Sequence, residues 1–91
     1  MGETAVRVFI EGKVQMVGFR YWMAREASLL GLDGWVRNLA DGSVEAVFSG
    51  PQEAVRAMVE GCWQGPPMAS VTTVSELAMK EAVEPGFRQY R

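Results

Sequence analysis

The sequence contains no histidine and only one cysteine, Cys62. Without histidine, the chain cannot build a histidine-based acid–base pair or a catalytic triad. A single cysteine excludes a disulfide within the chain and fits a reducing compartment such as the cytoplasm. The two shortages together argue against a structural zinc or haem site, so we expect no metal.

Clustered positive charge and long apolar runs are also missing. Nine Lys and Arg against eleven Asp and Glu give a net charge of −2, so we expect no nucleic-acid partner. No apolar run approaches the roughly 20 residues that span a bilayer, and no secretory signal begins the chain. We therefore expect a cytoplasmic protein without a membrane partner. Its 91 residues, 48% of them hydrophobic, predict one domain over residues 1–91.

The first third of the chain predicts a strand followed by a helix. After a frayed end at residues 1–4, apolar and polar residues alternate over residues 5–11, which indicates a strand with one buried face. Gly12 is expected to end this strand. Over residues 20–30 the apolar spacing becomes helical, and Gly31 suits the left-handed position that closes a helix.

The rest of the chain predicts a hairpin, a second helix and two more strands. Cys62 belongs to an ordinary core stripe on the second helix, and its thiol is assigned no chemistry. On the first helix we assign Tyr21 and Trp22 to the core, and we interpret Arg37 as a solvated strand charge. The expected segments are a strand at 32–39, a turn at 40–43, a strand at 44–49, a helix from Pro51 to the break at 64–67, a strand at 69–77, a loop at 78–86 and a short strand at 87–91.

This order predicts an α+β fold, the ferredoxin-like βαββαβ sandwich. Two helices would pack on one face of a mostly antiparallel sheet of four to five strands. A strand–helix–strand crossover makes the first two strands parallel, so their C-terminal ends lie at the same end of the sheet. The loop after the first strand and Asn38 at the end of the second are therefore expected to face each other.

The loop between the first strand and the first helix has the composition of an anion site. Residues 12–20 contain two glycines, two cations and no acidic residue, and they lead into a helix. Such a loop aims several N–H groups at one point, where the helix dipole adds positive potential. Arg20 adds a guanidinium fork that fits a phosphoryl group. Alone, this stretch fits a glycine-containing turn with a solvated Arg20 equally well, and Asn38 alone would simply end a strand. Their expected convergence favours a phosphate site.

Two motifs resemble the signatures of the acylphosphatase family. Gly12-Lys13-Val14-Gln15-Met16-Val17-Gly18-Phe19-Arg20-Tyr21 is similar to the first signature, and Gly34-Trp35-Val36-Arg37-Asn38-Leu39-Ala40-Asp41-Gly42-Ser43-Val44-Glu45 is similar to the second. Their separation and the order of elements match the family over nearly the whole chain.

The resemblance implies an enzyme that hydrolyses acyl phosphates to carboxylate and inorganic phosphate. Arg20 would then bind the phosphate, and Asn38 would position the attacking water. The resemblance implies no metal or organic cofactor and a small-molecule acyl phosphate as the only partner, and we expect a monomer. The backbone of five loop residues would cradle the phosphate: Gln15, Met16, Val17, Gly18 and Phe19.

Met16 departs from the family pattern, which usually has glycine at this position. At a positive φ, a methionine would cost on the order of 1–3 kcal/mol of strain. This residue favours one alternative, a noncatalytic or weakly active module that binds phosphate or a phosphorylated ligand on the same fold. RNA-recognition domains share the order of elements, but the acidic balance and the absence of a basic, aromatic strand signature argue against that alternative.

Overall fold

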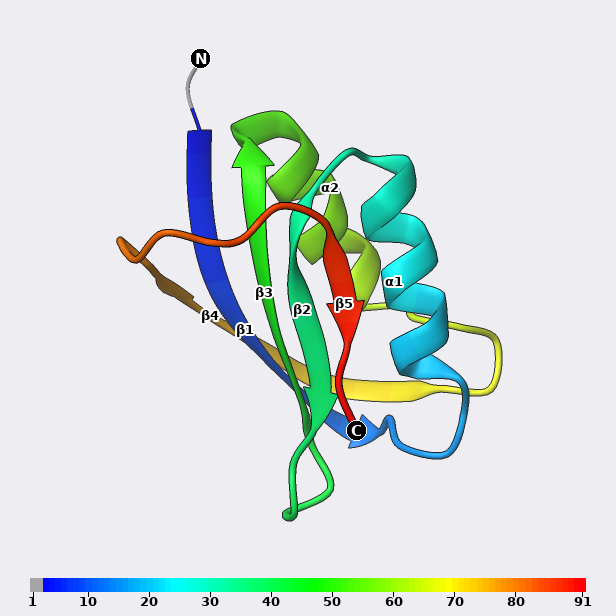
Figure 1. Cartoon of the computed structure of the whole chain (residues 1–91). Helices are drawn as coiled ribbons and strands as arrows, with labels where there is room; N and C mark the ends of the chain where they lie inside the picture. The colour runs from blue at the N-terminus through cyan, green and yellow to red at the C-terminus, as the bar shows by residue number, and fades with distance from the viewer. Residues whose placement is uncertain (1–2) are drawn as a thin grey trace.

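The computed structural model describes residues 3–91, so the expected frayed end at Met1 and Gly2 lies outside the described residues. The remainder of that expectation is wrong, because Thr4 lies in the first strand and pairs with Gly50. Other boundaries agree with the predicted ones to within two residues. In chain order the elements are β1 (Glu3–Lys13), α1 (Phe19–Leu29), β2 (Asp33–Asn38), β3 (Val44–Pro51), α2 (Gln52–Cys62), β4 (Ser70–Ala78) and β5 (Phe87–Gln89) (Figure 1).

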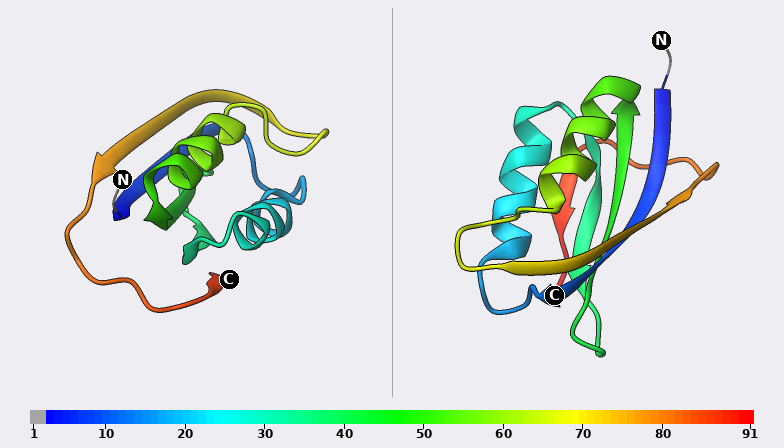
Figure 2. Two further views of the ribbon diagram at one scale, coloured as in Figure 1. Left: turned by 90° about the horizontal axis from the view of Figure 1, so that it is seen from above. Right: turned by 180° about the vertical axis from the view of Figure 1, so that it is seen from behind.

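The strands form one sheet in the order β4-β1-β3-β2-β5. β1 pairs antiparallel with β3 and β4, β2 pairs antiparallel with β3, and β5 runs parallel to β2. Both helices cover the same face of this sheet, as the opposite views in Figures 1 and 2 show. The arrangement confirms the predicted ferredoxin-like α+β fold. No helix within residues 3–91 is long and apolar enough to cross a bilayer.

The topology brings the C-terminal ends of β1 and β2 to the same end of the sheet. Both strands are antiparallel to β3, which lies between them, so they run in the same direction. Ile10 of β1 and Asn38 of β2 both pair with Val44 of β3. The loop that leaves β1 therefore starts close to the level of Asn38, as the crossover rule predicts.

Gly12 does not end β1, which continues to Lys13. The pairing of β1 with β4 shifts register between Glu11 and Gly12, and the backbone of Gly12 has a φ of 124°. A Cβ atom at this position would lie only 2.2 Å from the carbonyl oxygen of Ser70. The glycine thus allows a bulge and a close approach of two strands, rather than a turn.

The core lies between the sheet and the two helices, and the predicted buried faces are confirmed. Gly31 has a φ of 73° and closes α1, with hydrogen bonds from the N–H of Gly31 to the Ser28 carbonyl and from the N–H of Leu32 to the Ala27 carbonyl. The helical spacing over residues 20–30 also predicts a buried Leu30, but Leu30 is the exposed C-cap residue. The buried residues on these faces are Val6, Val8 and Ile10 from β1, Phe19, Met23 and Ala27 from α1, and Val55, Met58, Val59 and Cys62 from α2.

Cys62 is expected to resist alkylation in the native protein. Its side chain is fully buried, and burial raises the pKa of the thiol to about 12. Because the thiolate is the reactive form, modification by iodoacetamide at neutral pH should be roughly 100-fold or more slower than in denaturant. Mass spectrometry of the carbamidomethylated protein measures this ratio. Equal rates in native and denatured samples would contradict the described burial.

Arg37 is exposed on β2, as predicted, but its charge is paired as well as solvated. Its Nε donates to Oε1 of Glu45 at 2.7 Å, and its guanidinium carbon lies 5.4 Å from the centroid of the Trp35 ring. Nε of Arg7 lies 3.6 Å from the other carboxylate oxygen of Glu45. The Glu45 residue is only 3% exposed. This cluster lies on the sheet face away from the helices, so β3 is buried on both faces.

Candidate active site

The loop at residues 14–18 carries the chain from β1 into α1. Val14 is buried and Val17 packs against the core, so two apolar side chains anchor the loop. Gly18 is the N-cap residue of α1, with a φ of 79°. Among the described residues, no side chain caps this helix and no acidic residue lies in its first turn. The N–H groups at the start of α1 are therefore suited to bind an anion.

The side chain of Gln15 ties this loop to the β2–β3 hairpin. Its Nε2 donates to the carbonyl oxygen of Leu39 at 2.7 Å and to that of Ser43 at 2.9 Å. Asp41 fixes the hairpin, because its carboxylate accepts hydrogen bonds from the hydroxyl and the backbone N–H of Ser43. The bond from the hydroxyl, and to a lesser extent the bond from the N–H, lowers the pKa of Asp41. Sequence reasoning gave Gln15 a role only through its backbone, because no local pattern reports a contact between distant loops.

A cavity of about 150 Å³ lies where the loop, α1 and β2 meet. It brings together Arg20 from the first turn of α1 and Asn38 from the end of β2, the two side chains that the sequence predicts to converge. Two predicted loop residues, Gln15 and Val17, do not line it. Its walls are Val14, Met16, Gly18, Phe19, Arg20, Tyr21, Asn38 and Gln89.

The C-terminal segment holds the guanidinium of Arg20. Nη1 of Arg20 donates to the carbonyl oxygen of Tyr90 at 2.6 Å, and the N–H of Tyr90 donates to the carbonyl of Val36 at 2.8 Å. Arginine has five N–H donors, so this bond leaves others for a ligand in the cavity. Gln89 also lines the cavity. The sequence gave no signal for either contact, because both depend on the pairing of β5 with β2.

Met16 lies in the left-handed region, with a φ of 63°, and its side chain is fully exposed. For a residue other than glycine, this backbone conformation costs on the order of 1–3 kcal/mol of strain. Within residues 3–91 it is the one non-glycine residue with a positive φ. The strain expected from the sequence is therefore present, in the middle of the loop that leads to the cavity.

Replacing Met16 with glycine is expected to raise turnover or phosphate affinity. Glycine adopts this backbone without strain, and removal of the side chain opens the cavity mouth. We expect kcat/KM for acetyl phosphate to rise about two- to tenfold, which corresponds to recovering about 0.4–1.4 kcal/mol, a part of the roughly 1–3 kcal/mol of loop strain. Steady-state kinetics with inorganic phosphate as inhibitor measures both quantities. An unchanged or lower rate in a folded Met16→Gly protein would refute the prediction.

Tyr21 is not part of the core as predicted. Its side chain is 66% exposed and lines the cavity beside Arg20, because position 21 falls off the buried stripe of α1. Trp22 is confirmed as a core neighbour: its ring meets the ring of Phe19 edge-on, with centroids 5.4 Å apart. The helical period was right, but the assignment of two consecutive aromatic residues to one face was not.

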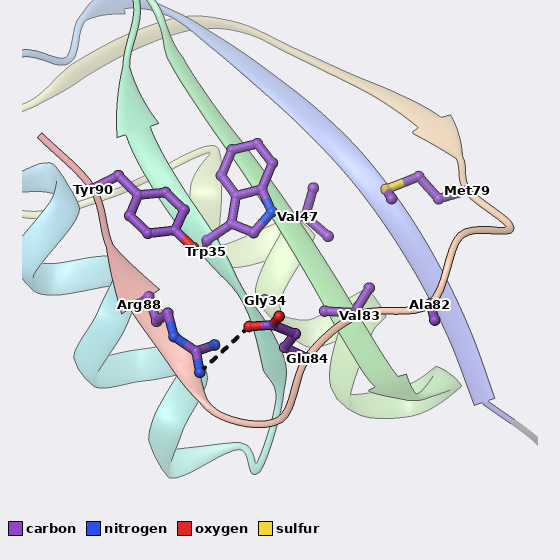
Figure 3. Close-up of a pocket in the computed structure, with 9 residues that line it drawn as sticks. All are labelled: Gly34, Trp35, Val47, Met79, Ala82, Val83, Glu84, Arg88 and Tyr90. Atoms are coloured by element: carbon purple, nitrogen blue, oxygen red, sulfur yellow. Dashed lines mark ion pairs between the residues drawn. The ribbon is translucent and has the colours of Figure 1, made fainter.

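A second cavity, of about 210 Å³, lies on the other face of the sheet (Figure 3). Trp35, Val47 and Tyr90 form part of its wall, and Arg88 at its rim is paired with Glu84 at 3.7 Å. In the described part of the chain no helix begins at this cavity, and the cation at its rim, Arg88, already has a carboxylate partner. The smaller cavity, which has a helix N-terminus, Arg20 and Asn38, is therefore the better candidate for an anion site.

Comparison with known proteins identifies the family. A family model described as acylphosphatase matches residues 6–89. An acylphosphatase of Sinorhizobium medicae is 53% identical over 85 residues, which cover 92% of this chain and 90% of that protein. An acylphosphatase of Nitrobacter hamburgensis is 47% identical, over 97% of this chain and 93% of the other.

Solved acylphosphatase structures have the same fold as this chain. The enzyme from Coxiella burnetii superposes with a TM-score of 0.93 at 38% identity, over 97% of this chain and 93% of that one. The enzyme from Bacillus subtilis superposes with a TM-score of 0.91 at 35% identity, over 96% of this chain and 98% of that one. With its fold, its cavity and these matches in agreement, the chain belongs to the acylphosphatase family.

Proposed function

We propose that the chain hydrolyses acyl phosphates to carboxylate and inorganic phosphate in the cavity that Arg20 and Asn38 share. The observation that carries the proposal is that these two side chains, 18 positions apart in the sequence, line one cavity at the N-terminus of α1. Membership of the acylphosphatase family supports the reaction.

Arg20 and the loop backbone are proposed to hold the phosphoryl group. Phosphoryl transfer requires mainly correct positioning and stabilisation of charge on the equatorial oxygens. A guanidinium fork, the loop N–H groups of residues 15–19 and the dipole of α1 all supply positive potential at one place. Because these donors are fixed before the substrate arrives, they act as a preorganised oxyanion site.

Asn38 is proposed to orient the attacking water. Its carboxamide oxygen accepts a hydrogen bond from the water, and its NH₂ group donates to a phosphate oxygen. The water oxygen bonds to phosphorus while the bond from phosphorus to the acyl oxygen breaks, and its electron pair leaves with the carboxylate. A carboxylate departs without protonation, so the reaction requires no general acid.

The substrate phosphate itself is proposed to accept the proton of the water, since an asparagine is no base at neutral pH. If so, activity should survive the loss of neighbouring acids. We expect Glu11→Gln and Asp41→Asn proteins to keep kcat/KM within about threefold of the wild type, the range that small structural changes produce. Loss of activity in either variant, with an intact circular dichroism spectrum, would assign the proton to that carboxylate instead.

The function is tested by hydrolysis of acetyl phosphate, with inorganic phosphate as inhibitor. The proposal predicts turnover above the spontaneous rate and competitive inhibition by phosphate. Phosphate binding without turnover would indicate the noncatalytic binding module instead. If the protein showed no turnover and bound no phosphate, both interpretations of the cavity would be wrong.

We further propose that the protein acts as a cytoplasmic monomer. The free, buried thiol of Cys62 supports a reducing compartment. Light scattering of the purified protein measures its mass in solution, and cell fractionation locates it.

A further inference from the structure

We infer that Gln15 is a positioning residue, whose side chain holds Asn38 in place relative to the phosphate loop. The inference rests on the proposed function and adds a residue to it. Gln15 does not line the cavity, so its carboxamide acts through Asn38 and not on the substrate.

The carboxamide of Gln15 uses both of its donors to join the loop to the hairpin. Its Nε2 donates to the Leu39 carbonyl at 2.7 Å and to the Ser43 carbonyl at 2.9 Å, 24 and 28 positions away in the sequence. An NH₂ group has two N–H donors, so this one is fully engaged. Within residues 3–91, no other side-chain hydrogen bond joins the loop at 14–18 to the turn at 39–43.

The two carbonyls that accept these bonds lie next to Asn38 along the hairpin. Leu39 directly follows Asn38 in the chain. Ser43 directly precedes Val44, which is the β3 partner of Asn38. The N–H of Leu39 also donates to the Ser43 carbonyl, at 2.9 Å. Gln15 therefore holds the part of the hairpin that continues from Asn38, the last residue of β2.

The placement of Asn38 relative to the loop decides whether water can attack in line. The attacking and leaving oxygens of a phosphoryl transfer lie roughly in line on opposite sides of phosphorus. The loop is proposed to hold the phosphoryl group and Asn38 the water, so two separate elements must keep a fixed separation. A misplacement of about 1 Å can cost roughly 100-fold in rate. The two bonds from Gln15 fix this separation.

The other anchors of the loop tie it to the core and not to the hairpin. Val14 is buried, and Val17 packs against the core cluster. Between them Met16 has a φ of 63°, and such strain persists only where the surroundings hold the backbone in place. Gln15 supplies a hold on the hairpin side, directly before the strained residue. Its bonds therefore keep the loop from relaxing away from Asn38.

The first test is the kinetics of Gln15→Ala and Gln15→Met proteins with acetyl phosphate. Alanine removes the side chain, and methionine keeps a similar length without an N–H donor. We expect each to lower kcat about 10- to 100-fold. Inhibition by inorganic phosphate should stay within about threefold of the wild type, since Arg20 and the loop N–H groups still bind phosphate. Gln52→Ala is the matched control, because Gln52 is exposed and begins α2 at the opposite end of the sheet (Figure 1).

Two further measurements show whether Gln15 acts through Asn38. In an Asn38→Ala background, adding Gln15→Ala should lower kcat by less than about twofold, because the group that it positions is gone. In ¹⁵N NMR spectra the side-chain amide signal of Asn38 should shift in Gln15→Ala and stay in place in Gln52→Ala. Thermal unfolding followed by circular dichroism checks that each variant is folded at the assay temperature.

Four results would overturn the inference: a kcat near that of the wild type in Gln15→Ala or Gln15→Met, a loss of phosphate inhibition that parallels the loss of kcat, a full further loss in the double variant, or an unmoved Asn38 signal. A variant unfolded at the assay temperature would assign the glutamine to folding instead. In each case hydrolysis by the wild type would leave the proposed function standing. Without that hydrolysis the proposed function would fail, and this inference with it.

Discussion

An Arg20→Ala protein is expected to lose about a thousandfold or more in kcat/KM for acetyl phosphate. Among residues 3–91, the guanidinium is the one cationic side chain that lines the cavity. It comes from the first turn of α1, where the helix dipole already favours an anion. Removing it takes away charge that stabilises the equatorial oxygens in the transition state. Inhibition by inorganic phosphate should weaken as well, because the same donors bind the product.

Arg25→Ala is the matched control for this variant. Arg25 lies on the same helix, is exposed, and does not line the cavity. Its loss should leave kcat/KM within about threefold of the wild type, as expected for a surface substitution. An Arg20→Ala protein with nearly wild-type kinetics, or an Arg25→Ala protein that is equally damaged, would remove Arg20 from the mechanism.

An Asn38→Ala protein is expected to lose about 100- to 1000-fold in kcat while binding phosphate nearly normally. The carboxamide is proposed to orient the water and to donate one hydrogen bond to a phosphate oxygen. Arg20 and the loop N–H groups supply the other donors, so losing Asn38 should affect the water more than the bound phosphate. The two variants should therefore differ in kind: Arg20→Ala weakens phosphate inhibition, whereas Asn38→Ala mainly lowers turnover. Steady-state kinetics with phosphate as inhibitor separates the two effects.

Loss of phosphate inhibition in Asn38→Ala, parallel to the loss of turnover, would mean that Asn38 binds phosphate rather than water. Asn38 also occupies the last position of β2 and pairs with Val44. Thermal unfolding followed by circular dichroism therefore accompanies the kinetics. A large fall in stability would attribute the loss of turnover to the strand end and not to the carboxamide.

The convergence of Arg20 and Asn38 was predictable because it depends on regular structure. Periodicity identifies β1, α1 and β2, and the crossover rule makes the two strands parallel. Each side chain sits at the end of such an element, so its place follows from the topology. The possible strain at Met16 came from the family resemblance instead, because the family usually has glycine at this position, and the structure shows that the φ there is positive.

The contacts that the sequence did not predict all join different structural elements. Gln15 reaches across to the hairpin, and Arg20 to the carbonyl of Tyr90, 70 positions away. Arg37 and Glu45 meet through the register of β2 on β3. Such contacts depend on exact register and side-chain direction, and no local pattern encodes either. The exposure of Tyr21 was missed because apolar residues at nearly helical spacing fit either face of a short helix.

The most direct test of the shared cavity is a titration of the ¹⁵N-labelled protein with inorganic phosphate, followed by NMR. We predict saturable shifts of the backbone amides of residues 15–20 and of the Asn38 side-chain amide, at the phosphate concentrations that inhibit hydrolysis. Shifts centred instead on Arg88 and the second cavity, with the loop and Asn38 unmoved, would contradict the account.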